Sequence, residues 1–484
     1  MLTNSFSLEQ RLPLAALKRG VSLALTLLLV AVLAILIHTQ SLMLSIALLG
    51  GVAAAILVLL HPTLGLCLLA FTIPFGGIKQ LALGGFTVDA SDLLIGLIMI
   101  SWLMRQTVQP TAVRKPGRWI LVLILFLYVA LLGLLPALDL SEAAKELLKW
   151  VEFALVWVFT AYGADRRLAG GVVASLLIAG SLQALVGISQ FLSSDGPASF
   201  ALQNGLSRAY GTFEQPNPFG GYLGLLLPIA FSVLLVLRPY RRREMVLWWL
   251  AAAAAALMGM GLAASGSRGA ILGLVAGIVG LLIVAGPRQR LWLAVGIAIL
   301  AASYSVWQQV VPVTYLERIS DLLTVGLKVN VDTVELTHAN FSLVERSAHW
   351  LAGWRMFERS PWLGVGLGQY DIVYPQVASL RWQQPLGHAH NYIINTMAEG
   401  GIVGLVSYLM LQAAWLWLAI TAVRRGDRSS RLLGLAAVGM WCALMTHNLV
   451  DNLYVHYIQL LPAMLLGLVV LCRGADCGLT GDRT

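Results

Sequence analysis

Long apolar runs recur along almost the whole of this 484-residue chain, and they constrain its fold more than any other feature. We count fourteen of them, the first at Val21–Ile37 and the last at Tyr457–Leu471. Each has the composition of a membrane-spanning helix, although Leu64–Phe75 and Ala90–Met104 are short. Only 11% of the residues are charged, against about 25% in soluble domains, so the bilayer is the solvent that suits the chain. The pattern predicts an all-α polytopic membrane protein with about 12–14 transmembrane helices.

Lysine and arginine residues gather in the connections on one side of the predicted membrane. If the N-terminus is cytoplasmic, 21 of them lie on the cytoplasmic side, and the outside segments other than residues 311–389, which are too long for the rule to apply, hold only Lys79, Arg208 and Arg268. This asymmetry is typical of multi-pass proteins, whose cytoplasmic loops are enriched in basic residues. We therefore predict that both termini are cytoplasmic. The same clustering explains the net charge of +9, so this charge is no reason to expect a nucleic-acid partner.

Two of the outside segments are long, and loops of that length in a compact protein are usually functional. One covers residues 193–218 and the other residues 311–389. We predict transmembrane helices 1–11 over residues 1–310, a large extracytoplasmic loop over 311–389, further transmembrane helices over 390–472, and a cytoplasmic tail over 473–484. Within the large loop, Ser342–Arg359 carries apolar residues at helical spacing and charged residues around them. This amphipathic pattern predicts a short helix at the membrane interface.

Two outside arginines are candidates for binding an anion. Arg268 stands in a tight turn of small residues, Ser265–Ala270, between two apolar runs. Small residues let the backbone approach a phosphate, and a guanidinium group binds it with two parallel hydrogen bonds. Arg208 opens a segment rich in glycine, proline and asparagine that leads into the next helix. The alternative for either residue is an arginine that only extends its charge into water at a helix end.

His390 is the strongest candidate for acid–base chemistry, because it stands where the large loop returns to the membrane. Histidine titrates near neutral pH and can act as a general base. Its neighbours His388 and Asn391 are secondary candidates, and Asp451 is a weaker one. We expect His388 to point elsewhere if a helix begins at His390. A metal site of His388 and His390 with His349 or His338 is an alternative, but no carboxylate pattern accompanies these histidines.

We therefore predict no bound metal and no cofactor. The four cysteines, Cys67, Cys442, Cys472 and Cys477, include no pair with metal-ligand spacing. None of them lies in the large loop, so we also expect no disulfide framework.

The motifs on the outside segments resemble those of the O-antigen ligase superfamily. His390-Asn391 is followed at fixed spacing by Gly401 and Gly404, as in that family's loop signature. The segment Arg346–Tyr370 resembles the one that precedes this signature. Gly211-Thr-Phe with Pro216-Asn-Pro218, and Ser267-Arg-Gly269, also resemble family motifs. The similarity covers roughly residues 170–450.

The resemblance implies a metal-independent, inverting glycosyltransferase with a GT-C type fold in the bacterial cytoplasmic (inner) membrane. Such enzymes transfer a glycan from undecaprenyl diphosphate to a glycan or lipid acceptor outside the cytoplasm, in lipopolysaccharide or other polysaccharide biosynthesis. It implies that Arg208 and Arg268 hold the diphosphate and that His390 activates the acceptor. Further substrate-binding residues by resemblance and position are Asn217, Arg346, His388 and Asn391.

Other functions remain open at this point. A polymerase of O-antigen or exopolysaccharide uses the same chemistry with a growing chain as acceptor. A transporter of a lipid-linked sugar is an alternative of another class, although such proteins tend to show inverted repeats, and we find none. A receptor or scaffold that binds a partner through the large loop is a third alternative.

Overall fold

The computed structural model describes residues 42–78, 81–83, 86–108, 116–202, 205–237, 239–291, 294–295, 330–337, 340–473, 477 and 479. The chain divides into two units, Met1–His61 and Pro62–Thr484. In the first unit, α2 (Leu42–Leu60) is an apolar helix of 19 residues. The predicted runs Val21–Ile37 and most of Leu291–Val310, the loop residues 311–329 and His338 lie outside the described residues.

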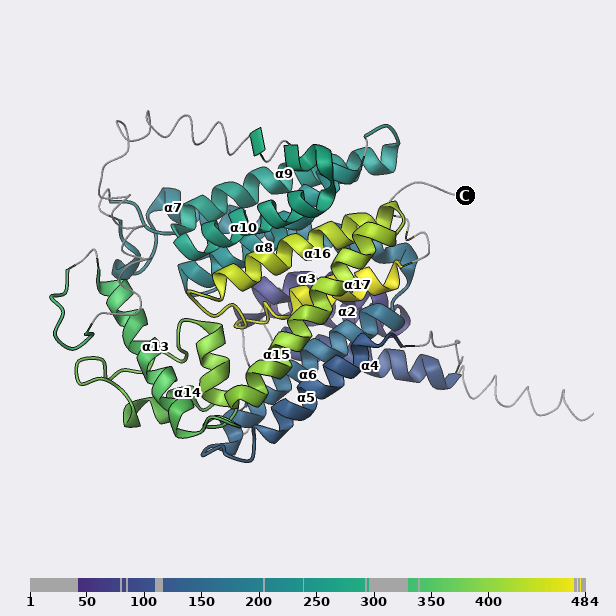
Figure 1. The fold of residues 1–484 in the computed structure, drawn as a ribbon. Coiled ribbons are helices and arrows are strands. Elements are labelled where there is room, and N and C mark those ends of the chain that lie inside the picture. The colour runs from purple at the N-terminus through teal and green to yellow at the C-terminus, as the bar shows by residue number, and fades with distance from the viewer. Residues whose placement is uncertain are drawn as a thin grey trace, which may run out of the picture. The chain divides into compact units, whose positions relative to one another are not determined.

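The second unit is built of helices, as predicted, with one short hairpin in its described part (Figure 1). Every predicted apolar run that lies in the described residues forms a helix, because a run of about 20 apolar residues can satisfy its backbone in lipid only in that way. The helices are α3 (Pro62–Phe75), α4 (Ala90–Val108), α5 (Trp119–Leu132), α6 (Leu140–Tyr162), α7 (Ala169–Ser193), α8 (Pro216–Val236), α9 (Arg242–Ser265), α10 (Arg268–Ala285), α13 (Phe341–Arg359), α14 (Tyr370–Val373), α15 (Tyr392–Arg425), α16 (Arg428–His447) and α17 (Leu460–Leu471).

Short elements complete the described fold. The strands β1 (Leu81–Leu83) and β2 (Phe86–Val88) pair antiparallel, with Leu81 opposite Val88. Four 3₁₀ turns are η1 (Gly76–Ile78), η2 (Arg166–Leu168), η3 (Ala198–Phe200) and η4 (Tyr374–Gln376).

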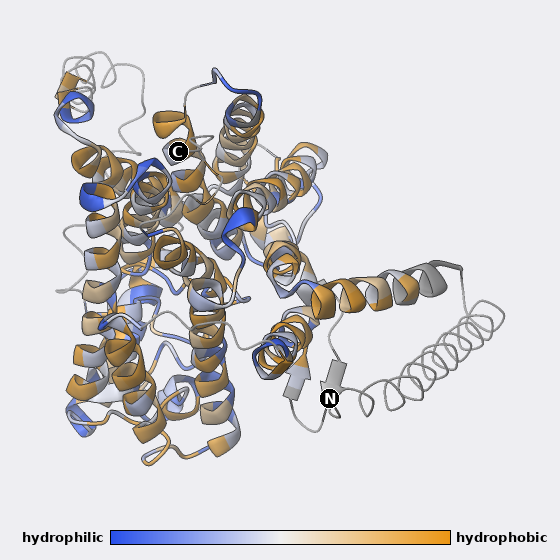
Figure 2. Cartoon of the chain, turned by 90° about the vertical axis from the view of Figure 1, so that its right-hand side faces the viewer, coloured by the Kyte–Doolittle hydropathy of each residue, from blue (hydrophilic) through white to orange (hydrophobic). Residues whose placement is uncertain are grey.

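Seven helices among the described residues are long and apolar enough to cross a membrane. They run over Ala90–Val108, Arg166–Ser193, Pro216–Val236, Glu244–Ser265, Arg268–Ala285, Tyr392–Arg425 and Arg428–His447. Figure 2 shows hydrophobic residues along the lengths of the helices and hydrophilic residues mainly toward their ends and in loops. Large apolar side chains such as Leu103 and Leu121 remain more than half exposed, which suits a surface that faces lipid. The protein is therefore an integral membrane protein.

The helix ends that carry basic clusters pack against one another. Arg428 forms an ion pair with Glu244, with 2.9 Å between Nη2 and Oε2, and it also donates to the carbonyl of Val236. Arg431 donates to the carbonyl of Ala285 at 2.7 Å. These residues come from connections that the charge pattern predicts on one side of the membrane.

A short disulfide joins Cys472 to Cys477, with 5.5 Å between their Cα atoms. The prediction that the cysteines form no disulfide is therefore wrong for this pair. The two cysteines are five residues apart in sequence, and their Cα separation lies in the usual range for a disulfide.

The helix α15 is interrupted at Gly401, whose backbone is not helical (φ 61°, ψ −158°). A loop that follows α13 fills the break. The amide of Val365 donates to the carbonyl of Ala398 at 2.9 Å, and the amide of Ile402 donates to the carbonyl of Pro361 at 2.8 Å. A Cβ atom at Gly401 would lie 2.4 Å from the backbone of Trp362, so only glycine fits there. The break holds the large loop on the helix that begins just after His390.

Candidate functional site

His390 and Asp451 face each other where the predicted large loop meets the segment between α16 and α17. The Nδ1 atom of His390 lies 3.5 Å from Oδ1 of Asp451, at the long end of hydrogen-bonding range. The other ring nitrogen of His390, Nε2, is buried and has no hydrogen-bond partner among the described residues. A carboxylate that accepts from Nδ1–H leaves the lone pair on Nε2. The pair can therefore present a base at Nε2.

The backbone around His390 is fixed from several sides. His390 itself adopts a left-handed conformation (φ 51°), and its carbonyl accepts from the indole of Trp350 at 3.4 Å. Asn391 caps α15, because its side-chain oxygen accepts from the amides of Ile393 and Ile394. This capping role commits the Asn391 oxygen to the helix. The amide of Tyr392 donates to the carbonyl of Asn448, which ties the start of α15 to the segment that carries Asp451.

A chain of hydrogen bonds connects this pair to Arg208. Nη2 of Arg208 donates to Oδ1 of Asn217 at 3.2 Å, and Nδ2 of Asn217 donates to Oδ2 of Asp451 at 2.8 Å. Asn217 stands in the first turn of α8, where the Pro216-Asn-Pro218 segment opens the helix. Nε of Arg208 also donates to the carbonyl of Ser265 at 2.8 Å. Four segments that are distant in sequence thus meet at one network.

Three arginines contribute positive charge to this region. Burial lowers the pKa of Arg208, and the charges of Arg268 and Arg346 lower it further. Arg268 is the first residue of α10, directly after the turn at Gly266 that packs on Arg208. Arg346, on α13, donates through Nη1 to Ser342, while its buried Nε has no hydrogen-bond partner in the described part of the chain. Like charges held this close favour the binding of an anion between them.

Asp451 places a negative charge beside the histidines. Burial acts to raise its pKa, but the hydrogen bond with His390 and the charges of His388 and His447 hold it well below its usual range. The carboxylate is therefore ionised at neutral pH. Its side chain is only 10% exposed, so its interaction with the His390 ring is weakly screened by water.

His388 points toward the site, contrary to the expectation for a helix that begins at His390. The helix begins at Tyr392 instead, and the left-handed residue His390 turns both imidazole rings toward Asp451. The ring centroids of the two histidines are 4.4 Å apart, and Nε2 of His388 lies 3.9 Å from Oδ1 of Asp451. Burial lowers the pKa of His388 to about 4. The sequence pattern showed no carboxylate for a metal site, and Asp451 supplies one. His388, His390 and Asp451 lie close enough together to bind an ion.

His349 packs behind the catalytic candidates, not with His388 around a common centre. Its ring stacks on Tyr374 at 4.6 Å between centroids and meets the ring of His390 edge-on at 5.4 Å. The hydroxyl of Tyr370 donates to its carbonyl at 2.7 Å. Burial lowers the pKa of His349 to about 3, so this histidine is neutral at physiological pH.

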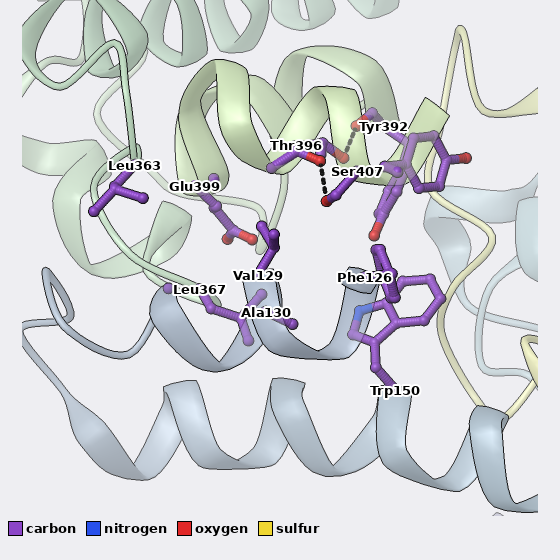
Figure 3. A pocket seen from close by; sticks show the side chains of 14 residues that line it. Phe126, Val129, Ala130, Trp150, Leu363, Leu367, Tyr392, Thr396, Glu399 and Ser407 are labelled. Carbon is purple, nitrogen blue, oxygen red and sulfur yellow. Dashed lines mark hydrogen bonds between the residues drawn. The ribbon is translucent and has the colours of Figure 1, made fainter. Parts of the chain in front are cut away.

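An apolar pocket adjoins the site (Figure 3). It encloses about 540 Å³ of space, including its open side. Four parts of the chain line it. The helix α5 contributes Phe126, Val129 and Ala130, and α6 contributes Trp150. The loop that fills the break in α15 contributes Leu363 and Leu367, and α15 itself contributes Tyr392, Thr396 and Glu399. Because Tyr392 follows Asn391 in sequence, the pocket begins close to His390. Its lining suits hydrocarbon or the apolar face of a sugar.

The amphipathic segment predicted at Ser342–Arg359 forms α13, as expected. It packs on the protein through small and medium-sized side chains such as Ala348, Ala352 and Met356, whereas Trp354 stays 47% exposed. The helix thus positions Arg346 and His349 and leaves the side chain of Trp354 partly exposed.

The structure brings together most of the residues that the sequence singles out, and it gives Asp451 the central place that the sequence did not. Residues 253–409 match the model of a family described as O-antigen ligase. The matched part contains Arg268, Arg346 and His390. Arg208, Asn217 and Asp451 lie outside it and join the site through the fold. No curated protein matches the chain.

Proposed function

We propose that the protein is a membrane glycosyltransferase of the ligase and polymerase class with a specific reaction, because residues 253–409 match the family described as O-antigen ligase. The protein moves a glycan from undecaprenyl diphosphate to an acceptor hydroxyl on the extracytoplasmic face of the bacterial inner membrane. The observation that carries this proposal is the hydrogen-bonded chain from Arg208 through Asn217 and Asp451 to His390. It joins a proposed anion-binding group to a base within one partly buried network.

The arginines hold the diphosphate of the donor. The charges of Arg268 and Arg346 raise the cost of the charge on Arg208, and a diphosphate relieves that cost. Charge-assisted hydrogen bonds from guanidinium to phosphate are each worth roughly 1.5–3 kcal/mol. They stabilise the leaving group as negative charge develops on it, so the bond from the sugar to the phosphate oxygen breaks more easily.

His390 activates the acceptor. Its Nε2 accepts the proton of the acceptor hydroxyl, while Asp451 holds the proton on Nδ1 and stabilises the imidazolium that forms. The acceptor oxygen then bonds to the anomeric carbon, and the lipid diphosphate leaves from the opposite face. Attack from the opposite face inverts the anomeric configuration. In this scheme the arginines supply the positive charge at the diphosphate, so we propose that the reaction needs no metal.

Transfer in vitro tests the proposal. Purified protein is mixed with a defined lipid-linked glycan and, in parallel reactions, with a lipid A core, an oligosaccharide chain or no acceptor. We expect glycan transfer that continues in excess EDTA and a product of inverted configuration at the new bond. Transfer that stops in EDTA and returns with a divalent ion would reject the metal-independent scheme.

The same reactions separate a ligase from a polymerase. Transfer to the lipid A core alone identifies a ligase, which we favour, and elongation of the lipid-linked glycan itself identifies a polymerase. Absence of transfer combined with movement of the lipid-linked glycan across a vesicle membrane would support the transporter instead.

A further inference from the structure

Three ligand atoms converge beside the proposed base. They are Nδ1 of His390, Nε2 of His388 and Oδ1 of Asp451, and all lie within 4.8 Å of one another. The carboxylate oxygen is 3.5 Å from the first nitrogen and 3.9 Å from the second. The proposed reaction uses His390 and Asp451 but gives no proton-transfer role to His388.

This spacing approaches that of a zinc site. Tetrahedral Zn²⁺ with bonds of about 2.0–2.1 Å separates its ligand atoms by about 3.3 Å, so only small side-chain rotations are needed to close the group on an ion. Two imidazoles and one carboxylate are ligands that Zn²⁺ accepts, with the fourth position left for water.

Further contacts already orient the ligands. Oδ2 of Asp451 accepts from Asn217, so the carboxylate is held with Oδ1 toward the histidines. The Nδ1 atom of His388 accepts from the amide of His390 at 3.1 Å and its Nε2 faces Asp451; coordination through Nε2 moves the ring proton to Nδ1, so this hydrogen bond is given up when the ion binds. The hydrogen bond from Asn217 is of the kind that fixes the orientation of a ligating carboxylate.

We propose that His388, His390 and Asp451 form a Zn²⁺ site whose occupation inhibits the enzyme; the inhibitory part rests on the function proposed above. A neutral imidazole carries one proton. When Nδ1 of His390 gives its lone pair to the ion, that proton stands on Nε2. Nε2 then has no lone pair to accept the proton of the acceptor hydroxyl. The ion also draws the Asp451 carboxylate away from its role as partner of the imidazolium.

Binding of the metal is measured first, without substrate. The purified full chain is stripped with EDTA, exchanged into metal-free buffer, and titrated with Co²⁺ while its visible absorption is recorded. We expect a tetrahedral Co²⁺ spectrum that Zn²⁺ abolishes, and equilibrium dialysis should give one Zn²⁺ per chain. His388→Ala and Asp451→Asn should each weaken binding at least about tenfold. The matched control is His456→Asn, which changes a histidine on the segment that carries Asp451 but outside the group.

Transfer is then measured on the same preparations. Zn²⁺ should abolish transfer by the wild-type protein, Mg²⁺ should not, and the residual activity of His388→Ala should resist Zn²⁺. Equal Zn²⁺ affinity in the wild type, His388→Ala and Asp451→Asn would overturn the site. Full occupancy with undiminished transfer would overturn the inhibition. A metal-free wild type that transfers nothing would overturn the proposed function, while the binding measurement still decides the metal site.

Discussion

Replacing Asp451 with asparagine keeps the shape of the side chain and removes its charge. In the structure one carboxylate oxygen accepts from Asn217 and the other faces Nδ1 of His390 at 3.5 Å. The new amide has only one acceptor atom. If its NH₂ group faces His390, it donates to Nδ1 and leaves the ring proton on Nε2, so the base is lost. If its NH₂ group faces Asn217, two donors meet and Asn217 must turn away from Arg208.

The structure sets the size of the effect. A positioned base contributes about 10²–10⁴-fold to a rate, and the arginines continue to stabilise the leaving group in this variant. We therefore expect Asp451→Asn to lower the transfer rate at saturating acceptor by about 10²–10³-fold, equivalent to roughly 2.7–4.1 kcal/mol of transition-state stabilisation. Donor binding, measured by equilibrium dialysis of the lipid-linked glycan, should change far less.

The control is Asp371→Asn. Asp371 accepts from the amide of Gly387 in the same large loop, but it does not belong to the network. This variant should transfer at close to the wild-type rate. If a folded Asp451→Asn protein retains transfer within tenfold of the wild type, the account of how His390 is oriented is wrong.

Four further perturbations test other parts of the structure. Arg268→Lys keeps the charge but loses the planar two-pronged donor, so transfer should fall steeply; wild-type turnover would show that guanidinium geometry is irrelevant. Gly401→Ala should lower the melting temperature in detergent, because the new Cβ atom meets the backbone of Trp362 and adds strain of about 1–3 kcal/mol. Gly400→Ala is the control and should leave the melting temperature unchanged, because the space at its Cβ is open. Acidification should destabilise the protein as pH falls below 6.5, because His349 (pKa about 3) and His388 (pKa about 4) stay neutral when folded and become protonated when unfolded. His349→Gln should flatten that dependence, and an unchanged slope would remove His349 as a cause. A cysteine introduced at Asn340 should react with an impermeant reagent from outside intact cells, and labelling only after the inner leaflet is permeabilised would reject the predicted topology.

The helices could be predicted because a membrane span leaves a local signature. A helix that spans the membrane needs about 20 consecutive apolar residues, so α8, α9 and α10 could be predicted from composition alone. The break in α15 was not readable in this way. Gly401 is non-helical because the loop at Trp362 inserts there, and that contact joins residues whose meeting depends on the whole fold.

The candidate site shows the same division. Arg208, Arg268 and His390 were found from the sequence, because each stands at a predicted outer boundary of the membrane, where an ionisable side chain is costly. Asp451 satisfies the same criterion, but its role depends on a contact with a residue 61 positions earlier. Its position between two apolar runs was the available signal. The orientation of His388 could not be predicted, because it follows from the left-handed backbone of His390 and from a helix that begins two residues later than assumed.

The most direct test of the central claim compares wild-type protein with His390→Ala in a single preparation series. Both are purified, shown to share one elution volume and melting temperature, and assayed for binding of the lipid-linked glycan and for its transfer. We expect that His390→Ala binds the donor as the wild type does and transfers no measurable glycan, since in the proposed reaction Nε2 of His390 accepts the acceptor's proton. Near-normal transfer by the folded variant would contradict that claim and leave the arginines as the main source of rate.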